Sequence, residues 1–310
     1  MNESRRIDLD ALPTEARNPA STDLDRMSTE ELVRLINAED ATVAAAVERE
    51  APSIAAAIDV IAERMARGGR LVYVGAGTSG RLGVLDAAEC LPTFNADPGQ
   101  VVGLIAGGRE ALARAVEGAE DSAEAGAADL RAIGLGADDA VVGIAASGRT
   151  PYVLGALDHA RSVGAATIAF ACNAQAEARH HADLGILPEV GPEVLTGSTR
   201  MKAGTATKMV LNMLSTGAMV RLGKTWGNLM VDVQATNEKL VERSLRIVQA
   251  ITGCDREEAR SALERCGGDL KTAAVSQALG LDPGAARAKL AAVGGRLQRL
   301  WLLALPIAGL

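Results

Sequence analysis

Three loops of this chain place hydroxyl side chains and glycines directly before a helical segment. They are Gly75–Gly80 (GAGTSG), Ser147–Thr150 (SGRT) and Leu195–Lys208 (LTGSTRMKAGTATK). The first N–H groups of a helix have no partner inside it, and the helix dipole favours negative charge at that end. Such loops therefore predict a phosphate-binding site. The residues expected to hold the anion are Gly77, Thr78, Ser79, Ser147, Gly148 and Thr150, with Ser198 and Thr199 from the third loop.

The glycines of the first loop fall at Gly75, Gly77 and Gly80, the G-x-G-x-x-G spacing of dinucleotide-binding loops. A dinucleotide site also needs an acidic residue at the end of the next strand, where it holds the ribose hydroxyls. The next apolar run instead ends in the sequence AGG (106–108). We therefore interpret the glycines as letting the backbone approach the phosphate of a smaller molecule.

Two cations, Arg200 and Lys202, follow the hydroxyls of the third loop. Either could neutralise a phosphate or carboxylate of a ligand, or lie on the surface as an ordinary solvated charge. The adjacent His180 and His181 are expected to point to opposite faces of a strand, so we expect no metal site there.

Short apolar runs that alternate with helical segments must position these loops. Runs of this kind, apolar on both alternations, are typical of strands covered on both faces. The pattern predicts an α/β fold with a doubly wound, parallel, five-stranded sheet. Because ligands bind outside the carboxyl ends of such strands, the first two loops are expected to face one pocket. The predicted strands are 71–77, 101–108, 140–147, 166–173 and 184–190.

Three regions are expected along the chain. Residues 1–56 form a polar, extended arm followed by helices, with capping-box spacing at Ser28 and Glu31 and with Pro52 opening a second helix. Residues 57–223 form the domain that carries the three phosphate loops. Residues 224–310 contain no further strand pattern, and glycines divide them into three or four short helices of a small domain.

Composition narrows the class of function. The net charge is -7 and aromatic residues make up 2%, which argues against a nucleic-acid partner. The four cysteines are widely spread, a pattern typical of reduced thiols in the cytoplasm. No apolar run reaches the ~18 residues that span a bilayer, and the first residues show no secretory pattern, so no membrane association is expected.

Several longer motifs resemble, in order, those of the N-acetylmuramic acid 6-phosphate etherases, a family of the sugar isomerase (SIS) superfamily. They are TEARNP (14–19), GAGTSGRLGVLDAAEC (75–90), VEGAEDS (116–122), SGRTPYV (147–153) and TGSTRMKAGTATKMVLNMLST (196–216). The resemblance covers nearly the whole chain. It implies the SIS fold, with a helical tail similar to a ubiquitin-associated (UBA) three-helix unit.

The resemblance also implies a reaction. The family cleaves the D-lactyl ether of N-acetylmuramic acid 6-phosphate, a carbon–oxygen lyase chemistry that uses no metal or redox cofactor. Its motifs place the two catalytic carboxyl groups on Glu89 and Glu120. We assign Glu89 as the proton donor to lactate and Glu120 as the base for the C2 proton. The apolar neighbours of Glu89 indicate partial burial of its side chain.

Glu89 lies ten residues beyond Ser79, about 15 Å away if one helix spans both. Either that helix breaks near Gly83, or Glu89 serves a site completed by a second subunit. We expect the second, because SIS domains typically form dimers that share their sites.

Two other functions remain open from the sequence. An aldose–ketose isomerase acting on sugar phosphates would use the same proton abstraction at C2 but would release no lactate. A regulatory SIS protein would sense a sugar phosphate without turnover. The presence of both Glu89 and Glu120 favours the etherase.

Overall fold

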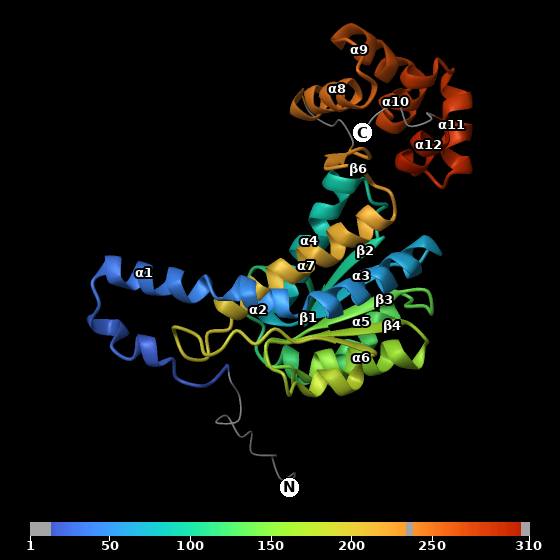
Figure 1. Ribbon diagram of the computed structural model, residues 1–310. Helices are drawn as coiled ribbons and strands as arrows, with labels where there is room; N and C mark the ends of the chain where they lie inside the picture. Colours follow the sequence, from blue (N-terminus) through green and yellow to red (C-terminus); the bar gives the residue numbers. More distant parts are fainter. Residues whose placement is uncertain (1–13, 234–237, 305–310) are drawn as a thin grey trace. The chain divides into compact units, whose positions relative to one another are not determined.

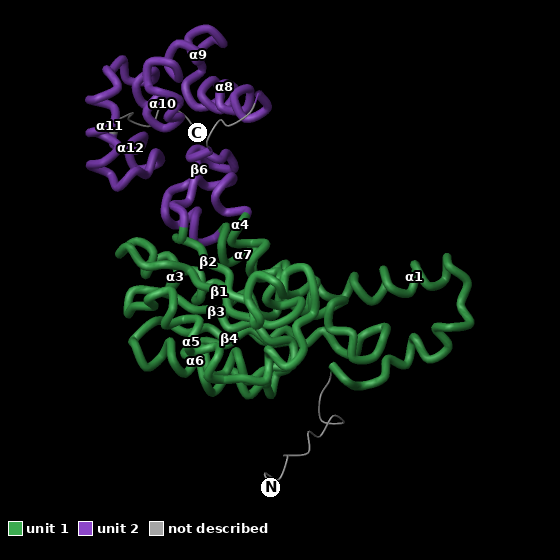
Figure 2. Tube along the Cα trace, turned by 180° about the vertical axis from the view of Figure 1, so that it is seen from behind, with its two compact units in different colours: residues 1–88, 99–216 green, residues 89–98, 217–310 purple. Residues whose placement is uncertain are grey.

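The computed structural model describes residues 14–233 and 238–304 (Figure 1). The chain divides into two compact units (Figure 2). Unit 1 comprises 1–88 and 99–216, and unit 2 comprises 89–98 and 217–310. Within the described ranges, no helix is both long enough and apolar enough to cross a membrane.

The core of unit 1 is a five-stranded parallel sheet in the order β2-β1-β3-β4-β5. Every residue of β1, β3 and β4 is buried, as expected for strands covered on both faces. The order reverses between β1 and β3, which is the switch point of a doubly wound sheet. The predicted fold class and all five strands are confirmed: β1 Leu71–Gly75, β2 Val101–Ile105, β3 Ala140–Ile144, β4 Ala166–Phe170 and β5 Leu184–Ile186.

Helices cover both faces of this sheet (Figure 1). On one face, α5 (Ala123–Ala132) packs against α6 (Pro151–Ser162), which contacts β1, β3 and β4. The other face carries α3 (Ala51–Ala66), α4 (Gly77–Phe94) and α7 (Lys202–Arg221). A buried hydrogen-bond chain joins strand and helices there: the Tyr73 hydroxyl and the Ser215 hydroxyl both donate to the Asp86 carboxylate.

The amino-terminal helices begin as the sequence predicts. Ser28 and Glu31 form the capping box of α1 (Thr29–Asp40), and Pro52 lies in the first turn of α3, after α2 (Val43–Arg49). The prediction of an extended arm is wrong for residues 14–27, which contain two short 3-10 helices, η1 (Pro19–Ser21) and η2 (Leu24–Arg26). Asn18 caps the first of them through its side chain, which favours a turn over an extended chain. Residues 1–13 of the predicted arm lie outside the described residues.

Unit 2 has its own apolar core, formed by α8 (Glu238–Thr252), α9 (Arg256–Arg265), α10 (Leu270–Leu279), α11 (Pro283–Ala292) and α12 (Leu297–Ala304). Its helical character agrees with the sequence, but these are five helices rather than three or four. It also contains an unexpected hairpin of β6 (Thr225–Trp226) and β7 (Leu229–Met230). Gly227, with φ +53°, permits the tight turn between these two-residue strands, and Trp226 packs edge-on against Trp301.

The glycines of the first loop have different roles. A Cβ on Gly80 would lie 2.6 Å from the carbonyl oxygen of Gly75 and 2.6 Å from Cγ1 of Ile105. Gly75 and Gly80 therefore allow α4 to pack closely on the strand ends. Only Gly77 has a left-handed conformation, with φ +52°.

Gly80→Ala is expected to destabilise the protein by about 1–3 kcal/mol, because the added methyl group overlaps backbone as well as side chain. Chemical denaturation measures the change in the free energy of unfolding. Gly136→Ala is the matched control, since a Cβ there meets no atom within 4 Å and the backbone has no positive φ. Equal stability of the two variants would contradict the packing role of Gly80.

Candidate active site

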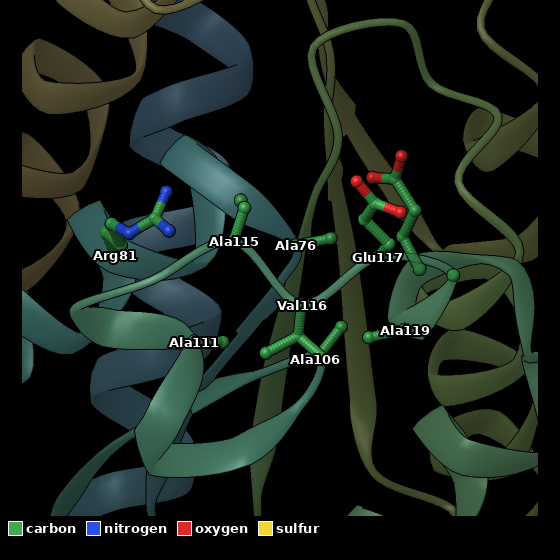
Figure 3. A pocket seen from close by; sticks show the side chains of 11 residues that line it. Ala76, Arg81, Ala106, Ala111, Ala115, Val116, Glu117 and Ala119 are labelled. Atoms are coloured by element: carbon green, nitrogen blue, oxygen red, sulfur yellow. The ribbon is translucent and has the colours of Figure 1, made fainter.

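A cavity of about 340 Å³ lies at the carboxyl ends of β1 and β2, over the amino terminus of α4 (Figure 3). It brings together Gly77 and Glu120, two residues that the sequence assigned to the site from segments about forty positions apart. The remaining lining residues are Ala76, Arg81, Ala106, Ala111, Ala115, Val116, Glu117, Gly118 and Ala119. All of them belong to unit 1.

The first loop presents an anion-binding helix terminus to this cavity. In the described part of the chain, the N–H groups of Gly77, Thr78 and Ser79 have no acceptor, and the two hydroxyls make no hydrogen bond. A Cβ on Gly77 would meet no atom within 4 Å, so the backbone faces open space. These are the groups that would hold a phosphate.

The second loop follows β3, the strand next to β1, with Gly75 paired to Ile144. Ser147 accepts a weak hydrogen bond from the N–H of Arg149 at 3.4 Å, and the Thr150 hydroxyl makes no capping bond to α6. The first two loops therefore follow neighbouring strands at the switch point. No residue of the second loop lines the cavity, so a pocket shared by the two loops stays a prediction. Gly148 has φ +74°, and a Cβ there would lie 2.3 Å from that of Ala176, so its glycine identity is explained by chain geometry.

The third loop differs from the prediction, because a carboxylate of the chain itself occupies the start of α7. Glu193 is fully buried and accepts the N–H groups of Lys202 and Ala203 at 2.9 and 3.0 Å. The Lys202 side chain is 3% exposed and its Nζ lies 2.6 Å from Oε2 of Glu39. Asn18 donates to the same oxygen at 2.8 Å. Lys202 therefore belongs to an ion pair within the chain, and its assignment as a ligand of substrate stays a prediction.

Within residues 14–233 and 238–304, the other candidate residues of this loop are not engaged in a buried ion pair. Ser198 and Thr199 are half-buried, and Arg200 is exposed without an ion pair among the described residues. A Cβ on Gly204, in the first turn of α7, would lie 3.6 Å from the Thr199 carbonyl oxygen and 3.8 Å from Cγ2 of Thr78. The first and third loops are therefore neighbours.

Glu89 lies on α4, which runs without a break from Gly77 to Phe94. Gly83 does not interrupt the helix; a Cβ there would approach that of Tyr73 to 2.9 Å, so this glycine serves packing on the sheet. Glu89 is exposed, and the expectation of partial burial is wrong for the single chain. About 15 Å of helix separates it from Ser79.

Arg81 is a site residue that the sequence reasoning missed. Its Nε and Nη2 donate to the carbonyl oxygens of Leu112 and Arg114 at 3.2 and 3.3 Å. Arg81 thereby ties α4 to the segment that leads to Glu120. Figure 3 shows Arg81 and Glu117 on opposite sides of the cavity. The sequence did contain a signal for Arg81, because a cation one turn inside a helix predicted to bind an anion is a candidate for the same site.

Several known proteins similar to this chain are N-acetylmuramic acid 6-phosphate etherases. An N-acetylmuramic acid 6-phosphate etherase from Rhodopirellula baltica is 57% identical over 292 residues, which cover 94% of this chain and 97% of that protein. Etherases from Rubrobacter xylanophilus and Streptomyces avermitilis are each 59% identical and cover 92% of this chain, and 94% and 92% of their own lengths. The chain belongs to the N-acetylmuramic acid 6-phosphate etherase family.

Domain models agree with this etherase membership. The model of the glucokinase regulatory protein N-terminal SIS domain matches residues 22–161, and the SIS domain model matches 120–217. The model of the C-terminal lid domain of glucokinase regulatory protein matches 227–276. The SIS match ends next to the boundary between the two units at 216/217.

Arg81→Gln is expected to lower the kcat for the etherase reaction roughly tenfold, about 1.4 kcal/mol of transition-state stabilisation, with little change in KM. The physical reason is that the segment carrying Glu120 loses its two hydrogen bonds to α4. Steady-state kinetics measures both constants. Arg109→Gln, an exposed residue of η3 (Gly108–Leu112) outside the cavity, is the control. A raised KM at constant kcat would instead indicate that Arg81 binds substrate directly.

Glu39→Gln is expected to destabilise the protein by about 3 kcal/mol, since it leaves the Lys202 ammonium buried without its counter-charge. The hydrogen bond from Lys202 holds the pKa of Glu39 below its usual value of 4.5. A carboxyl group whose pKa is lowered by folding stabilises the folded state at pH values above its unfolded pKa. This stabilisation is lost as the pH falls through the pKa of the folded state. The difference in the free energy of unfolding between wild type and variant should therefore shrink below about pH 4.5. Denaturation across pH measures it, and adding Lys202→Met to the variant should recover part of the loss.

Proposed function

We propose that this chain converts N-acetylmuramic acid 6-phosphate to N-acetylglucosamine 6-phosphate and D-lactate. The observation that carries the proposal is the cavity of unit 1, in which the Glu120 side chain shares a space with the open amino terminus of α4. The names of relatives at 56–59% identity over most of the chain support the choice of substrate.

The chemistry follows from where the ether lies on the sugar. In the open-chain form, C3 is β to the aldehyde. Glu120 removes the proton at C2, and the resulting enolate expels the lactyl oxygen from C3, which Glu89 protonates. Water then adds to the unsaturated aldehyde at C3, so the net result is hydrolysis. The enzyme is accordingly a carbon–oxygen lyase, and its residues need only move protons.

The phosphate is assigned to the amino terminus of α4 and the hydroxyls around it. Thr78 and Ser79 come from the first loop, and Ser147 and Thr150 come from the second. Their free donors match an oxyanion with several acceptor atoms. Ser198 and Thr199 remain candidates through the contact between the first and third loops. Arg200 is the cation proposed for the lactyl carboxylate, because Lys202 is engaged with Glu39.

A shared site in a homodimer is proposed to bring Glu89 to the substrate. An exposed carboxyl group about 15 Å from Ser79, in the first turn of its own helix, is poorly placed to act on a hexose bound there. Leu85, one turn before Glu89 on the same face of α4, is 45% exposed, as an apolar residue at a subunit contact would be in a single chain. Such an enzyme would act in the cytoplasm on amino sugars derived from peptidoglycan.

The test is turnover of N-acetylmuramic acid 6-phosphate in water enriched in the heavy oxygen isotope. Elimination followed by hydration places the label at C3 of the product sugar and none in the lactate. Label in lactate would refute elimination, and the absence of lactate release would refute the etherase proposal. Conversion of the sugar without lactate release would point to the isomerase.

A further inference from the structure

A second polar cavity, of about 320 Å³, lies entirely within unit 2. It lies where the last residues of α7, the turn of the β6–β7 hairpin and the first residues of α12 meet. The residues that line it are Val220, Arg221, Gly223, Thr225, Gly227, Arg296, Leu297, Gln298 and Arg299. None of them belongs to the proposed active site.

The lining is strongly positive in a chain whose net charge is -7. It contains three arginines, and no Asp or Glu of the described chain lines it. Arg221 has a partner of its own, whereas neither Arg296 nor Arg299 forms an ion pair within the described ranges. Arg296, which is half-buried, and Arg299, which is exposed, therefore bring positive charge that no such partner neutralises to the cavity wall, and this charge favours an added anion.

The backbone adds donors to these side chains. The N–H groups of Arg299 and Leu300 donate to the Arg296 carbonyl oxygen, where α12 begins at the wall of the cavity. The two preceding amides, of Leu297 and Gln298, have no acceptor within the helix. A Cβ on Gly223, which has φ +80°, would lie 2.6 Å from Cγ of Arg296. The stem of Arg296 therefore lies directly across a position that only glycine leaves open.

We propose that this cavity binds a small dianion of the phosphate monoester class. Two guanidinium groups and the amino terminus of α12 would hold the phosphate oxygens, because a guanidinium matches an oxyanion with paired donors. The volume is at the lower end of ligand pockets and fits a small metabolite rather than a dinucleotide. Binding would stabilise unit 2, since a ligand that binds only the folded state raises its stability.

The chain carries its own reporter for the test. Both of its tryptophans are close in sequence to the cavity: Trp226 follows Thr225, and Trp301 is one turn beyond Leu297 on α12. The full chain is titrated with inorganic phosphate at constant ionic strength, and tryptophan fluorescence and melting temperature are recorded. Wild type should show a saturable fluorescence change and a rise in melting temperature.

Arg296→Gln combined with Arg299→Gln should weaken the apparent phosphate affinity seen by fluorescence at least roughly tenfold. Arg299→Gln alone should weaken it in the same direction, which guards against misfolding caused by the loss of Arg296. The control variant is Arg287→Gln with Lys289→Gln, which removes two exposed charges from α11 outside the cavity and should bind as wild type does. A wild type without a saturable response, or a response unchanged in both arginine variants, would overturn the proposal. Lactate release is measured in parallel, so that failure here is distinguishable from failure of the etherase proposal.

Discussion

Glu120→Gln is expected to lower kcat for lactate release by about 10²–10⁴-fold, because the amide cannot accept the C2 proton. Solvent exchange at C2 should disappear together with turnover. The change is isosteric, so KM should alter little. Both quantities are measurable on one sample, by lactate assay and by following deuterium uptake at C2 in heavy water.

Two carboxylates on the same segment provide matched comparisons for this result. Glu117 lines the cavity with Glu120, whereas Glu110 lies on η3 outside it. Glu110→Gln should leave the kinetics unchanged, and Glu117→Gln should retain exchange at C2. If Glu117→Gln abolishes exchange while Glu120→Gln preserves it, the roles of the two cavity carboxylates are reversed.

Glu89→Gln is expected to reduce lactate release by a similar factor while exchange at C2 continues, because proton abstraction precedes departure of the lactyl oxygen. This separation of exchange from release distinguishes the proposed acid from the proposed base. Loss of both processes in Glu89→Gln, with retained stability, would show that Glu89 is needed for proton abstraction as well.

Mixing the two inactive variants tests whether the site is shared. If Glu89 and Glu120 of different subunits form each site, a mixed dimer contains one intact site and one doubly altered site. Random reassociation should then restore roughly a quarter of wild-type activity. No recovery after subunit exchange, confirmed by a tagged chain, would place both carboxyl groups in one subunit's site.

The sheet of unit 1 was predictable because its signal is local. Each strand is a short run of apolar residues bounded by glycine or polar positions, and burial on both faces requires that composition. The first two hydroxyl-bearing loops were predictable for the same reason, since a helix that starts directly after a strand presents free amides whatever else the fold contains. The hairpin of unit 2 was missed because its two-residue strands are too short to form an alternating pattern.

The third loop shows where local reasoning stops. Its hydroxyls and glycines resemble those of the first loop, yet Glu193 accepts the amides at the start of α7. Glu193 is nine positions before Lys202, and no periodic pattern links them. The partner of Lys202 is more distant still, because Glu39 is 163 positions away and meets it only after α1 and α7 have packed. Arg81 was overlooked for a related reason, since its acceptors are backbone carbonyl oxygens, which every residue carries.

By itself the sequence determined the strands, the two loops at their carboxyl ends and the motifs that mark the etherase family, because each depends on neighbours along the chain. Only the tertiary structure decided that Lys202 is buried in an ion pair, that Glu120 shares a cavity with the start of α4, and that Glu89 is exposed on an unbroken helix. These outcomes depend on which distant segments pack together. A buried charge needs a partner, so its surroundings in the fold decide its role more than its residue type does. The same residue types can therefore leave the amides of a helix start free in one loop and stand beside amides that are already bonded in another.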